Sequence, residues 1–391
     1  MKRKRYFGKR ALCILCCSMV ISMLSALYLG WARFGDHRPD WLSGDGSQPE
    51  VKVDRYPTEP ENIIGNDRLC WLKGMYDNRN WELYTSYQIR HYDFSTSTAV
   101  RGEIMDFGRG TGASILLSDA ADAPYVVCAG GDAYKITAVS EEGMGDTYKL
   151  YLDNSRYILA VYQGNAYYID DTNASISYAY GEEMLPSYLC RKSKDGSIQR
   201  YELSTAEELF VLAPDGKFAE IQMDGDRRVL CIRDANGETT LVEPPSERGG
   251  DYLYFGWNGT QTLYFTKYDA EKKASALWRY DVQNQSVYAC LDRQGDPIYL
   301  APRAIGFRLF PSPSGDVIAY FCYNSPYYSG MNDPHYAALV AQSMRTGEFC
   351  VLDETVQLSR SEEDLGDYIE DFGISARSAD IVWQKGDEKS H

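Results

Sequence analysis

Few side chains in this sequence have the types and the spacing that enzymatic catalysis requires. A hydrolase needs a nucleophile, a base and an acid that orients the base. Of the four histidines, His37, His91, His335 and His391, only His335 stands in a loop that could present a base. No Ser or Cys is paired with His335 by a motif, and no Gly-x-Ser-x-Gly sequence occurs. We therefore predict no catalytic residue, and we favour a protein that is not an enzyme.

A glycine-rich stretch and three pairs of adjacent carboxylates also suggest chemistry. The stretch FGRGTGAS, from Phe107 to Ser114, resembles a phosphate-binding loop but lacks the Lys-Ser/Thr and the helix that follow such a loop. Paired carboxylates serve glycosidases and calcium sites. They occur here at Glu141-Glu142, Asp170-Asp171 and Glu362-Glu363. Each pair lies in a polar turn or a charged run, so we expect solvated surface for the acids and a β-turn for the glycines.

The placement of the cysteines argues against a metal centre. Seven of them lie beyond the first 35 residues, namely Cys70, Cys128, Cys190, Cys231, Cys290, Cys322 and Cys350. They are scattered singly, whereas structural zinc sites use closely spaced pairs, and an odd number is a poor disulfide framework. We expect them to be small core side chains in strands, and we predict no metal and no cofactor.

One insertion offers a candidate contact surface. The stretch NSPYYSGMNDPHY, from Asn324 to Tyr336, separates two strand-like segments. Loops inserted on one face of a repeat protein often form its binding face. Tyr327, Tyr328, His335 and Tyr336 would form an exposed aromatic cluster there, and they are the predicted ligand contacts. The alternative is that this loop packs as a cap on the domain.

A repeated phrase indicates the elements that would position these residues. IRHYDFSTST, from Ile89 to Thr98, and LWRYDVQNQS, from Leu277 to Ser286, share a basic side chain or ring, then Tyr, Asp, an apolar residue and a polar turn. IQRYELSTAE, from Ile198 to Glu207, repeats this order closely, and less complete copies begin at Tyr134, Tyr167, Cys231 and Val340. Aligned on the residue before the acid, the seven copies recur about every 42 residues, which is a spacing typical of propeller blades.

Hairpin signals accompany this repeat. LFVLAPDGKFAEI, from Leu209 to Ile221, and LFPSPSGDVIAYF, from Leu309 to Phe321, both have a strand pattern, a turn with Pro and Gly, and a second strand pattern. Further hairpin tips are expected at Asp195-Gly196 and Asn258-Gly259. No convincing amphipathic helix occurs in the body, so we predict an all-β domain.

These turns resemble those of the TolB-like and WD40-like β-propeller repeat families. In such families a Ser-Pro-Asp-Gly turn joins two strands, and here Ser314 stands in place of the Asp. The resemblance covers residues 63–385 and implies a β-propeller of about seven blades, with six or eight blades as alternatives. Propellers commonly close by pairing strands from the two chain ends. The strand-like segment DIVWQ, from Asp380 to Gln384, is therefore expected to close the ring.

The first residues predict a membrane anchor. Residues 1–10 contain six Lys and Arg, and Ala11 to Trp31 are 21 residues without a charged side chain. A helix of that length spans the roughly 30 Å hydrocarbon core of a bilayer, and the basic flank predicts a cytoplasmic N-terminus. We expect a cytoplasmic tail over 1–10, one transmembrane helix over 11–31, a flexible linker over 32–62, an extracytoplasmic propeller over 63–385 and a polar tail over 386–391. The alternative is a cleaved signal peptide.

The distribution of charge excludes one class of partner. Seven of the 40 Lys and Arg fall in the first 35 residues, which hold no acid, so all 56 Asp and Glu lie in the rest of the chain. Because the part of the chain after residue 35 is strongly acidic, it repels the phosphate backbones of nucleic acids, and we predict no nucleic-acid partner. The sequence predicts a single-pass protein of the cell membrane whose propeller binds a protein, peptide or glycan. The alternative is a carbohydrate-active propeller enzyme that uses paired carboxylates.

Overall fold

The computed structural model describes most of the chain beyond residue 59. The described residues are 60–75, 86–106, 113–118, 124–130, 133–152, 157–170, 188–203, 210–224, 227–234, 236–242, 254–301, 304–322, 336–357 and 381–384. All of them belong to the second of two compact units, Met1–Asp54 and Arg55–His391. Within the described ranges, no helix has the length and apolar character to cross a membrane. The predicted transmembrane segment, 11–31, lies outside them.

The described residues form 24 strands and one short 3-10 helix, η1 (Pro60–Asn62). The strands make six blades, each of four antiparallel strands. From the inner to the outer strand, blade 1 holds β24 (Ile381–Gln384), β1 (Arg68–Met75), β2 (Ser86–Asp93) and β3 (Thr98–Asp106). Blade 2 holds β4 (Ala113–Ser118), β5 (Tyr125–Gly130), β6 (Ala133–Ser140) and β7 (Gly143–Leu150). Blade 3 holds β8 (Tyr157–Tyr162), β9 (Asn165–Asp170), β10 (Tyr188–Lys192) and β11 (Ile198–Glu202).

The other three blades repeat this order. Blade 4 holds β12 (Phe210–Leu212), β13 (Phe218–Asp224), β14 (Arg227–Arg233) and β15 (Thr239–Leu241). Blade 5 holds β16 (Phe255–Asn258), β17 (Thr262–Asp269), β18 (Ala274–Asp281) and β19 (Ser286–Ala289). Blade 6 holds β20 (Ala304–Pro311), β21 (Val317–Cys322), β22 (Tyr336–Ser343) and β23 (Phe349–Gln357).

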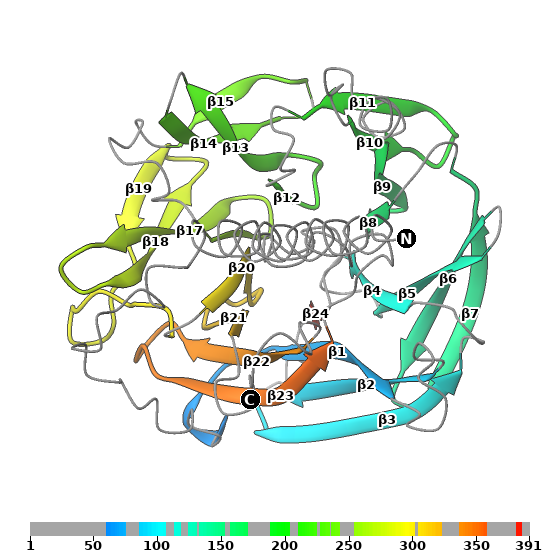
Figure 1. The fold of residues 1–391 in the computed structure, drawn as a ribbon, viewed down its shortest axis with the longest axis horizontal. Coiled ribbons are helices and arrows are strands. Elements are labelled where there is room, and N and C mark those ends of the chain that lie inside the picture. The colour runs from blue at the N-terminus through cyan, green and yellow to red at the C-terminus, as the bar shows by residue number, and fades with distance from the viewer. Residues whose placement is uncertain are drawn as a thin grey trace, which may run out of the picture. The chain divides into compact units, whose positions relative to one another are not determined.

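The blades follow one another around a common centre, which confirms the predicted all-β propeller (Figure 1). Neighbouring inner strands pair in parallel at two places. Leu117 of β4 lies beside Ala160 of β8, and Phe255 of β16 lies beside Arg308 of β20. The inner strands of blades 2 and 3, and those of blades 5 and 6, are thus close enough to share hydrogen bonds.

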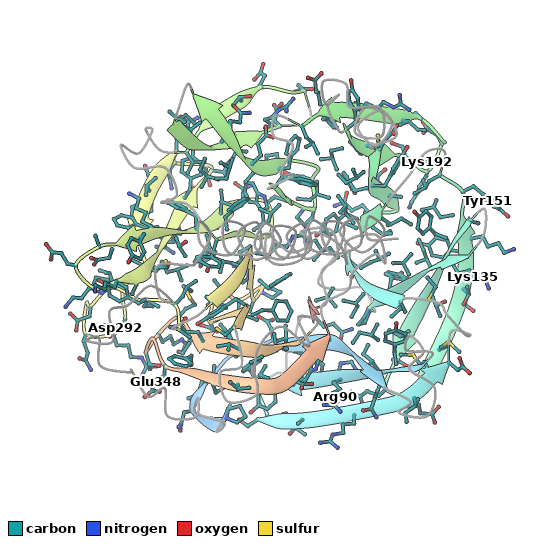
Figure 2. All side chains as sticks on the ribbon, viewed as in Figure 1. Arg90, Lys135, Tyr151, Lys192, Asp292 and Glu348 are labelled. Atoms are coloured by element: carbon teal, nitrogen blue, oxygen red, sulfur yellow. The ribbon has the colours of Figure 1, made fainter. Side chains whose placement is uncertain are left out.

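Apolar side chains fill the space between neighbouring blades (Figure 2). Alternate residues of a strand point to opposite faces of its sheet, so each blade contributes to the core on both of its sides. Tyr167 of blade 3 packs with Phe210 and Phe218 of blade 4, for example, and all three side chains are fully buried. Because each blade buries its faces against its neighbours, the described blades depend on one another for stability.

The last strand closes the ring, as the segment from Asp380 to Gln384 predicted. β24 pairs with β1 in an antiparallel register that runs from Arg68 opposite Gln384 to Trp71 opposite Ile381. A buried polar contact also joins blade 6 to blade 1 beside this closing strand. The carboxylate of Asp353 in β23 accepts hydrogen bonds from Trp71 Nε1 at 2.9 Å and from Arg90 Nη1 at 3.0 Å.

The repeated phrase has a structural cause at the turn between the third and fourth strands of a blade. In blade 1 the carboxylate of Asp93, which ends β2, accepts hydrogen bonds from the backbone N–H groups of Ser95 at 2.9 Å and Thr96 at 3.2 Å. In blade 5 the carboxylate of Asp281, which ends β18, accepts one from the N–H of Asn284 at 3.0 Å, and this bond lowers the pKa of the Asp281 carboxyl. The acid therefore holds a hairpin turn.

The described strands give six blades, so the predicted count of about seven is not confirmed. Five copies of the phrase lie at the turn between third and fourth strands. The copies that begin at Tyr167 and Ile198 instead lie on β9 and β11, the second and fourth strands of blade 3. The corresponding turn of that blade contains Asp195-Gly196 and lacks the Tyr-Asp phrase. Two copies of the phrase therefore fall in blade 3, which is why seven copies correspond to six blades.

Candidate ligand-binding cavity

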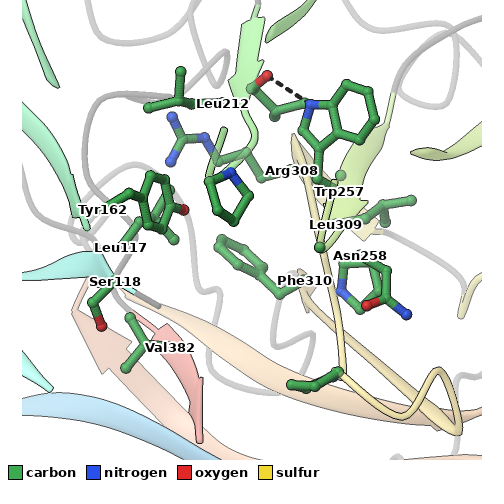
Figure 3. A pocket seen from close by; sticks show the side chains of 16 residues that line it. Leu117, Ser118, Tyr162, Leu212, Trp257, Asn258, Arg308, Leu309, Phe310 and Val382 are labelled. Carbon is green, nitrogen blue, oxygen red and sulfur yellow. Dashed lines mark hydrogen bonds between the residues drawn. The ribbon is translucent and has the colours of Figure 1, made fainter. Parts of the chain in front are cut away.

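A cavity of about 360 Å³ lies where the inner strands converge. Every blade contributes a side chain from its inner strand, namely Val382 (β24), Leu117 (β4), Tyr162 (β8), Leu212 (β12), Trp257 (β16) and Arg308 (β20). The turns that follow three of these strands also reach the cavity, through Pro214, Gly259 and Pro313. The cavity therefore lies toward the C-terminal ends of these three inner strands, where the chain turns into the second strand of the blade (Figure 3).

The lining of this cavity is largely apolar and aromatic. Tyr162, Trp257 and Phe310 supply three rings, and Ser118 and Asn258 supply short polar side chains. In the part of the chain that the structure describes, Arg308 is the one charged residue that lines the cavity, and it is 9% exposed. A concave site of roughly 300–1,000 Å³ with apolar walls and a few polar groups is typical of small-ligand binding. The cavity is at the lower end of that range.

Two local features fix the wall formed by blades 5 and 6. The indole of Trp257 donates a hydrogen bond from Nε1 to the carbonyl of Val211 in blade 4 at 3.0 Å, which orients the ring (Figure 3). Gly256 lets β16 approach β20, because a Cβ at this position would lie 1.8 Å from the carbonyl oxygen of Leu309. Only glycine fits there, and the close approach places Phe255 beside Arg308 in the parallel pairing.

The sequence predicted the turns around the cavity but not the cavity itself. The turn at Ala213–Gly216 is held by its own acid, since the carboxylate of Asp215 accepts the N–H of Lys217 at 3.2 Å. In the corresponding turn of blade 6, Ser314 replaces that acid. The buried carboxylate of Asp67, which lies just before β1, accepts the N–H of Ser314 at 2.8 Å. The bond that corresponds to the one accepted by Asp215 is made here by Ser314 Oγ, which accepts the N–H of Asp316 at 3.4 Å, and Asp67 adds a separate contact between this turn and the start of blade 1.

The predicted aromatic contacts lie largely outside the described part of the chain. Tyr327, Tyr328 and His335 are not among the described residues, and Tyr336 begins β22, the third strand of blade 6. The predicted cluster over 324–336 stays a prediction.

The acids of the predicted pairs that the structure describes, Glu141, Glu142 and Asp170, do not line the cavity. Glu141 forms an ion pair with Arg68 at 3.2 Å, and Asp170 forms one with Arg200 at 3.2 Å. Asp171, Glu362 and Glu363 lie outside the described residues. Of the glycine-rich stretch, only Ala113 and Ser114 are described, and they open the strand β4. Within the described ranges, no cluster of His, Cys, Asp or Glu is arranged to hold a metal ion.

A Cys-His pair that sequence spacing did not reveal lies between β1 and β2. The Sγ of Cys70 is 2.9 Å from Nδ1 of His91, and it also donates to Oε1 of Gln384 at 3.3 Å. Burial raises the pKa of the Cys70 thiol above its usual range and lowers the pKa of His91 to about 4. A thiol that is fully buried and protonated is a poor nucleophile. This pair is therefore part of the core at the ring closure.

Comparison with known proteins gives similarity in fold and no closer relationship. No protein-family model and no curated protein matches the chain. It is similar to the structure of TolB from Acinetobacter baumannii, with 10% identity, 82% of this chain and 68% of that chain covered, and a TM-score of 0.47. It is also similar to the structure of TolB from Agrobacterium tumefaciens, with 14% identity, 75% of this chain and 92% of that chain covered, and a TM-score of 0.43. A third similar structure is an oligogalacturonate lyase in complex with manganese, with 12% identity, 76% of this chain and 81% of that chain covered, and a TM-score of 0.43.

Proposed function

We propose that this protein is a binding module whose ligand enters the central cavity. The observation that carries the proposal is the convergence of the six described inner strands on one cavity, whose described lining has aromatic walls and a single guanidinium. Rigid strands that meet at a common centre hold their side chains in fixed positions, which reduces the entropy lost on binding. A protein segment, a peptide or a glycan remains the expected class of partner.

The alternative of a carbohydrate-active enzyme lacks a supporting observation at this site. Glycoside hydrolysis needs two carboxyl groups that face each other across the substrate at about 5–10 Å. Among the described residues that line the cavity there is no Asp, Glu, His or Cys. Ser118 lines it without a base beside it in that lining. We therefore assign the cavity a role in binding.

Membrane anchoring through Ala11–Trp31 is the second part of the proposal. Its support is the uncharged run itself and the six basic residues before it. The full chain should remain in the membrane fraction, and protease added to intact cells should remove a tag at its C-terminus. A soluble form that begins near Arg33 would show instead that the segment is a cleaved signal peptide.

The cavity can be tested with a variant that fills it. Ser118→Trp places an indole at the cavity wall, whereas Thr240→Trp places one on an exposed outer strand of blade 4 as a matched control. The full chain and both variants would be screened by ligand-observed NMR against short peptides, amino-acid derivatives and sugars. The proposal predicts compounds that bind the unaltered chain and Thr240→Trp but not Ser118→Trp. Compounds that bind all three proteins equally would place the binding site elsewhere.

A further inference from the structure

We propose that the group that enters the cavity is an uncharged aromatic side chain, such as that of Phe or Trp, carried by a peptide or protein partner. This inference rests on the proposed function of the cavity as a ligand site and names the chemistry of its occupant. Three features of the described lining support it: its rings, its size and the small number of its polar side chains.

Three aromatic rings in the lining are suited to pack against another ring. Tyr162, Trp257 and Phe310 come from the inner strands of blades 3, 5 and 6, so they reach the cavity from different directions. In Figure 3 Tyr162 and Trp257 lie on opposite sides of the view, with Phe310 between them. Aromatic pairs in offset or edge-to-face contact contribute more than the burial of their area alone. An aromatic group is therefore better suited to this space than an aliphatic one.

Two of these rings are held in place by contacts within the protein. Trp257 Nε1 donates a hydrogen bond to the carbonyl of Val211 at 3.0 Å, and Phe310 packs edge-to-face against Phe321 with ring centroids 6.2 Å apart. Because this N–H is the only donor of the indole, Trp257 offers a ligand its apolar surface. Rings that are already oriented lose little entropy when a ligand binds.

The size of the cavity fits one aromatic side chain together with the backbone next to it. A cavity of about 150 Å³ lined by apolar side chains holds a benzene molecule, and this one has a volume of about 360 Å³. The space beside one ring is therefore large enough for a second fused ring or for a peptide group. Asn258, which ends β16, brings an amide to the lining, with both donors and an acceptor. Such a side chain can pair with the N–H or the C=O of a peptide.

Sugars and charged side chains suit the described lining less well. A sugar brings several hydroxyl groups, and hydroxyls buried without partners weaken binding. Ser118 and Asn258 are the only Ser, Thr, Asn or Gln among the described residues of the lining. The same residues include no acid that could neutralise a Lys or Arg side chain. Arg308 interacts with another group of the chain, and the binding of an uncharged side chain requires nothing from its charge.

The test compares five probes on the full chain by NMR titration. Four are capped tripeptides, N-acetyl-Gly-X-Gly-amide with Trp, Leu, Lys or Glu as X, and the fifth is cellobiose. The Trp tripeptide should bind about 2- to 12-fold more tightly than the Leu tripeptide, which is the range expected for one pair of rings. The Lys and Glu tripeptides and cellobiose should bind more weakly than both. Ser118→Trp, which fills the cavity, should abolish binding of the Trp tripeptide.

Two matched variants test the ring contact at Trp257. Trp257→Leu removes a ring from the cavity and should reduce the preference for the Trp tripeptide over the Leu tripeptide. Trp278→Leu makes the same change in the same blade at a ring that packs under Lys267, and it should keep the preference. Melting curves would establish that both variants are folded. A preference that survives Trp257→Leu and is lost in Trp278→Leu would overturn the assignment.

The other outcomes separate this inference from the proposed function. Equal affinity for the Trp and Leu tripeptides, both abolished by Ser118→Trp, would leave the cavity as a binding site but overturn the aromatic assignment. Tightest binding of the Lys or Glu tripeptide would overturn the uncharged assignment, and binding of cellobiose alone would overturn the peptide assignment in favour of a glycan. Failure of all five probes would overturn the inference, while the wider compound screen still decides whether the cavity binds a ligand. The comparison of tripeptides on the unaltered chain needs no variant, so it holds even if Trp257→Leu fails to fold.

Discussion

Removal of β24 should destabilise the whole propeller, because this strand joins the last part of the chain to the first blade. The change is a chain that ends at Gly373, and the matched control is a chain that ends at Lys385, which keeps β24 and loses only the polar tail. In the intact protein four residues of β24 pair with β1, and Val382 is 4% exposed in the core between blades 1 and 2.

The size of the effect follows from these contacts. Burial of Val382 contributes about 2 kcal/mol, and roughly four inter-strand hydrogen bonds contribute about 1 kcal/mol each. The expected loss of about 6 kcal/mol is a large part of the roughly 5–15 kcal/mol that stabilises a folded domain. With an unfolding entropy of about 2.1 cal/mol/K per residue, a unit of roughly 330 residues should melt about 9 °C lower.

Circular dichroism and scanning calorimetry of both truncated chains would measure this change. The chain that ends at Lys385 should melt like the full protein, and the chain that ends at Gly373 should melt at a much lower temperature in one transition or fail to fold. If the chain that ends at Gly373 melted within about 2 °C of the control, closure of the ring through β24 would not contribute to stability and the reasoning would be refuted.

The remaining predictions concern a glycine, a histidine and the inserted loop. Gly256→Ala should lower the unfolding free energy measured in urea by about 1–3 kcal/mol, because the new Cβ would overlap the Leu309 carbonyl. The control is Gly145→Ala, whose Cβ would make ordinary contacts and which should change the unfolding free energy by less than about 1 kcal/mol. Equal effects of the two substitutions would refute the close approach of β16 and β20 at Gly256. Burial lowers the pKa of His91 to about 4, so the unfolded chain binds more protons than the folded one between that pKa and the ordinary value of 6.5. Unfolding free energy should therefore fall by about 2 kcal/mol between pH 7 and pH 5 through this group, and His91→Gln should show a smaller fall over the same interval; an unchanged pH dependence would contradict a neutral buried imidazole. Tyr327→Ala combined with Tyr328→Ala should leave the melting temperature unchanged and weaken ligand capture if the loop contacts the ligand, and a lower melting temperature with intact binding would show that these rings are core.

The sequence was sufficient for the parts of the fold that depend on local chemistry. Turns such as that after Asp281 could be predicted because an acid that accepts nearby backbone N–H groups leaves a short pattern in the chain. The closing strand at 381–384 could be predicted from its alternation and its place near the end of the repeats. The number of blades could not, because β9 and β11 carry the same pattern of strand followed by acid as the true third strands.

The cavity could not be predicted because its lining is assembled from distant parts of the chain. Leu117 and Val382 both line it from neighbouring blades, although one lies early in the chain and the other close to its end. Arg308 lines the cavity from β20, a strand that pairs with β16 of the neighbouring blade, and no short sequence pattern specifies that pairing. The turns after the inner strands, at Pro214 and Pro313, were the one local signal near the site, and three-dimensional structure was needed to show that they surround a common space.

Fluorine NMR of Trp257 tests the central claim most directly, because this side chain lines the cavity. The protein would be labelled with 5-fluorotryptophan, which gives a signal for each of its seven Trp residues, and the signal of Trp257 would be assigned with Trp257→Phe. Our account predicts that a compound found to bind in the screen of peptides, amino-acid derivatives and sugars moves the Trp257 signal in a saturable way and leaves those of tryptophans outside the cavity unchanged. A probe that saturates the protein and moves another signal while that of Trp257 stays in place would contradict it.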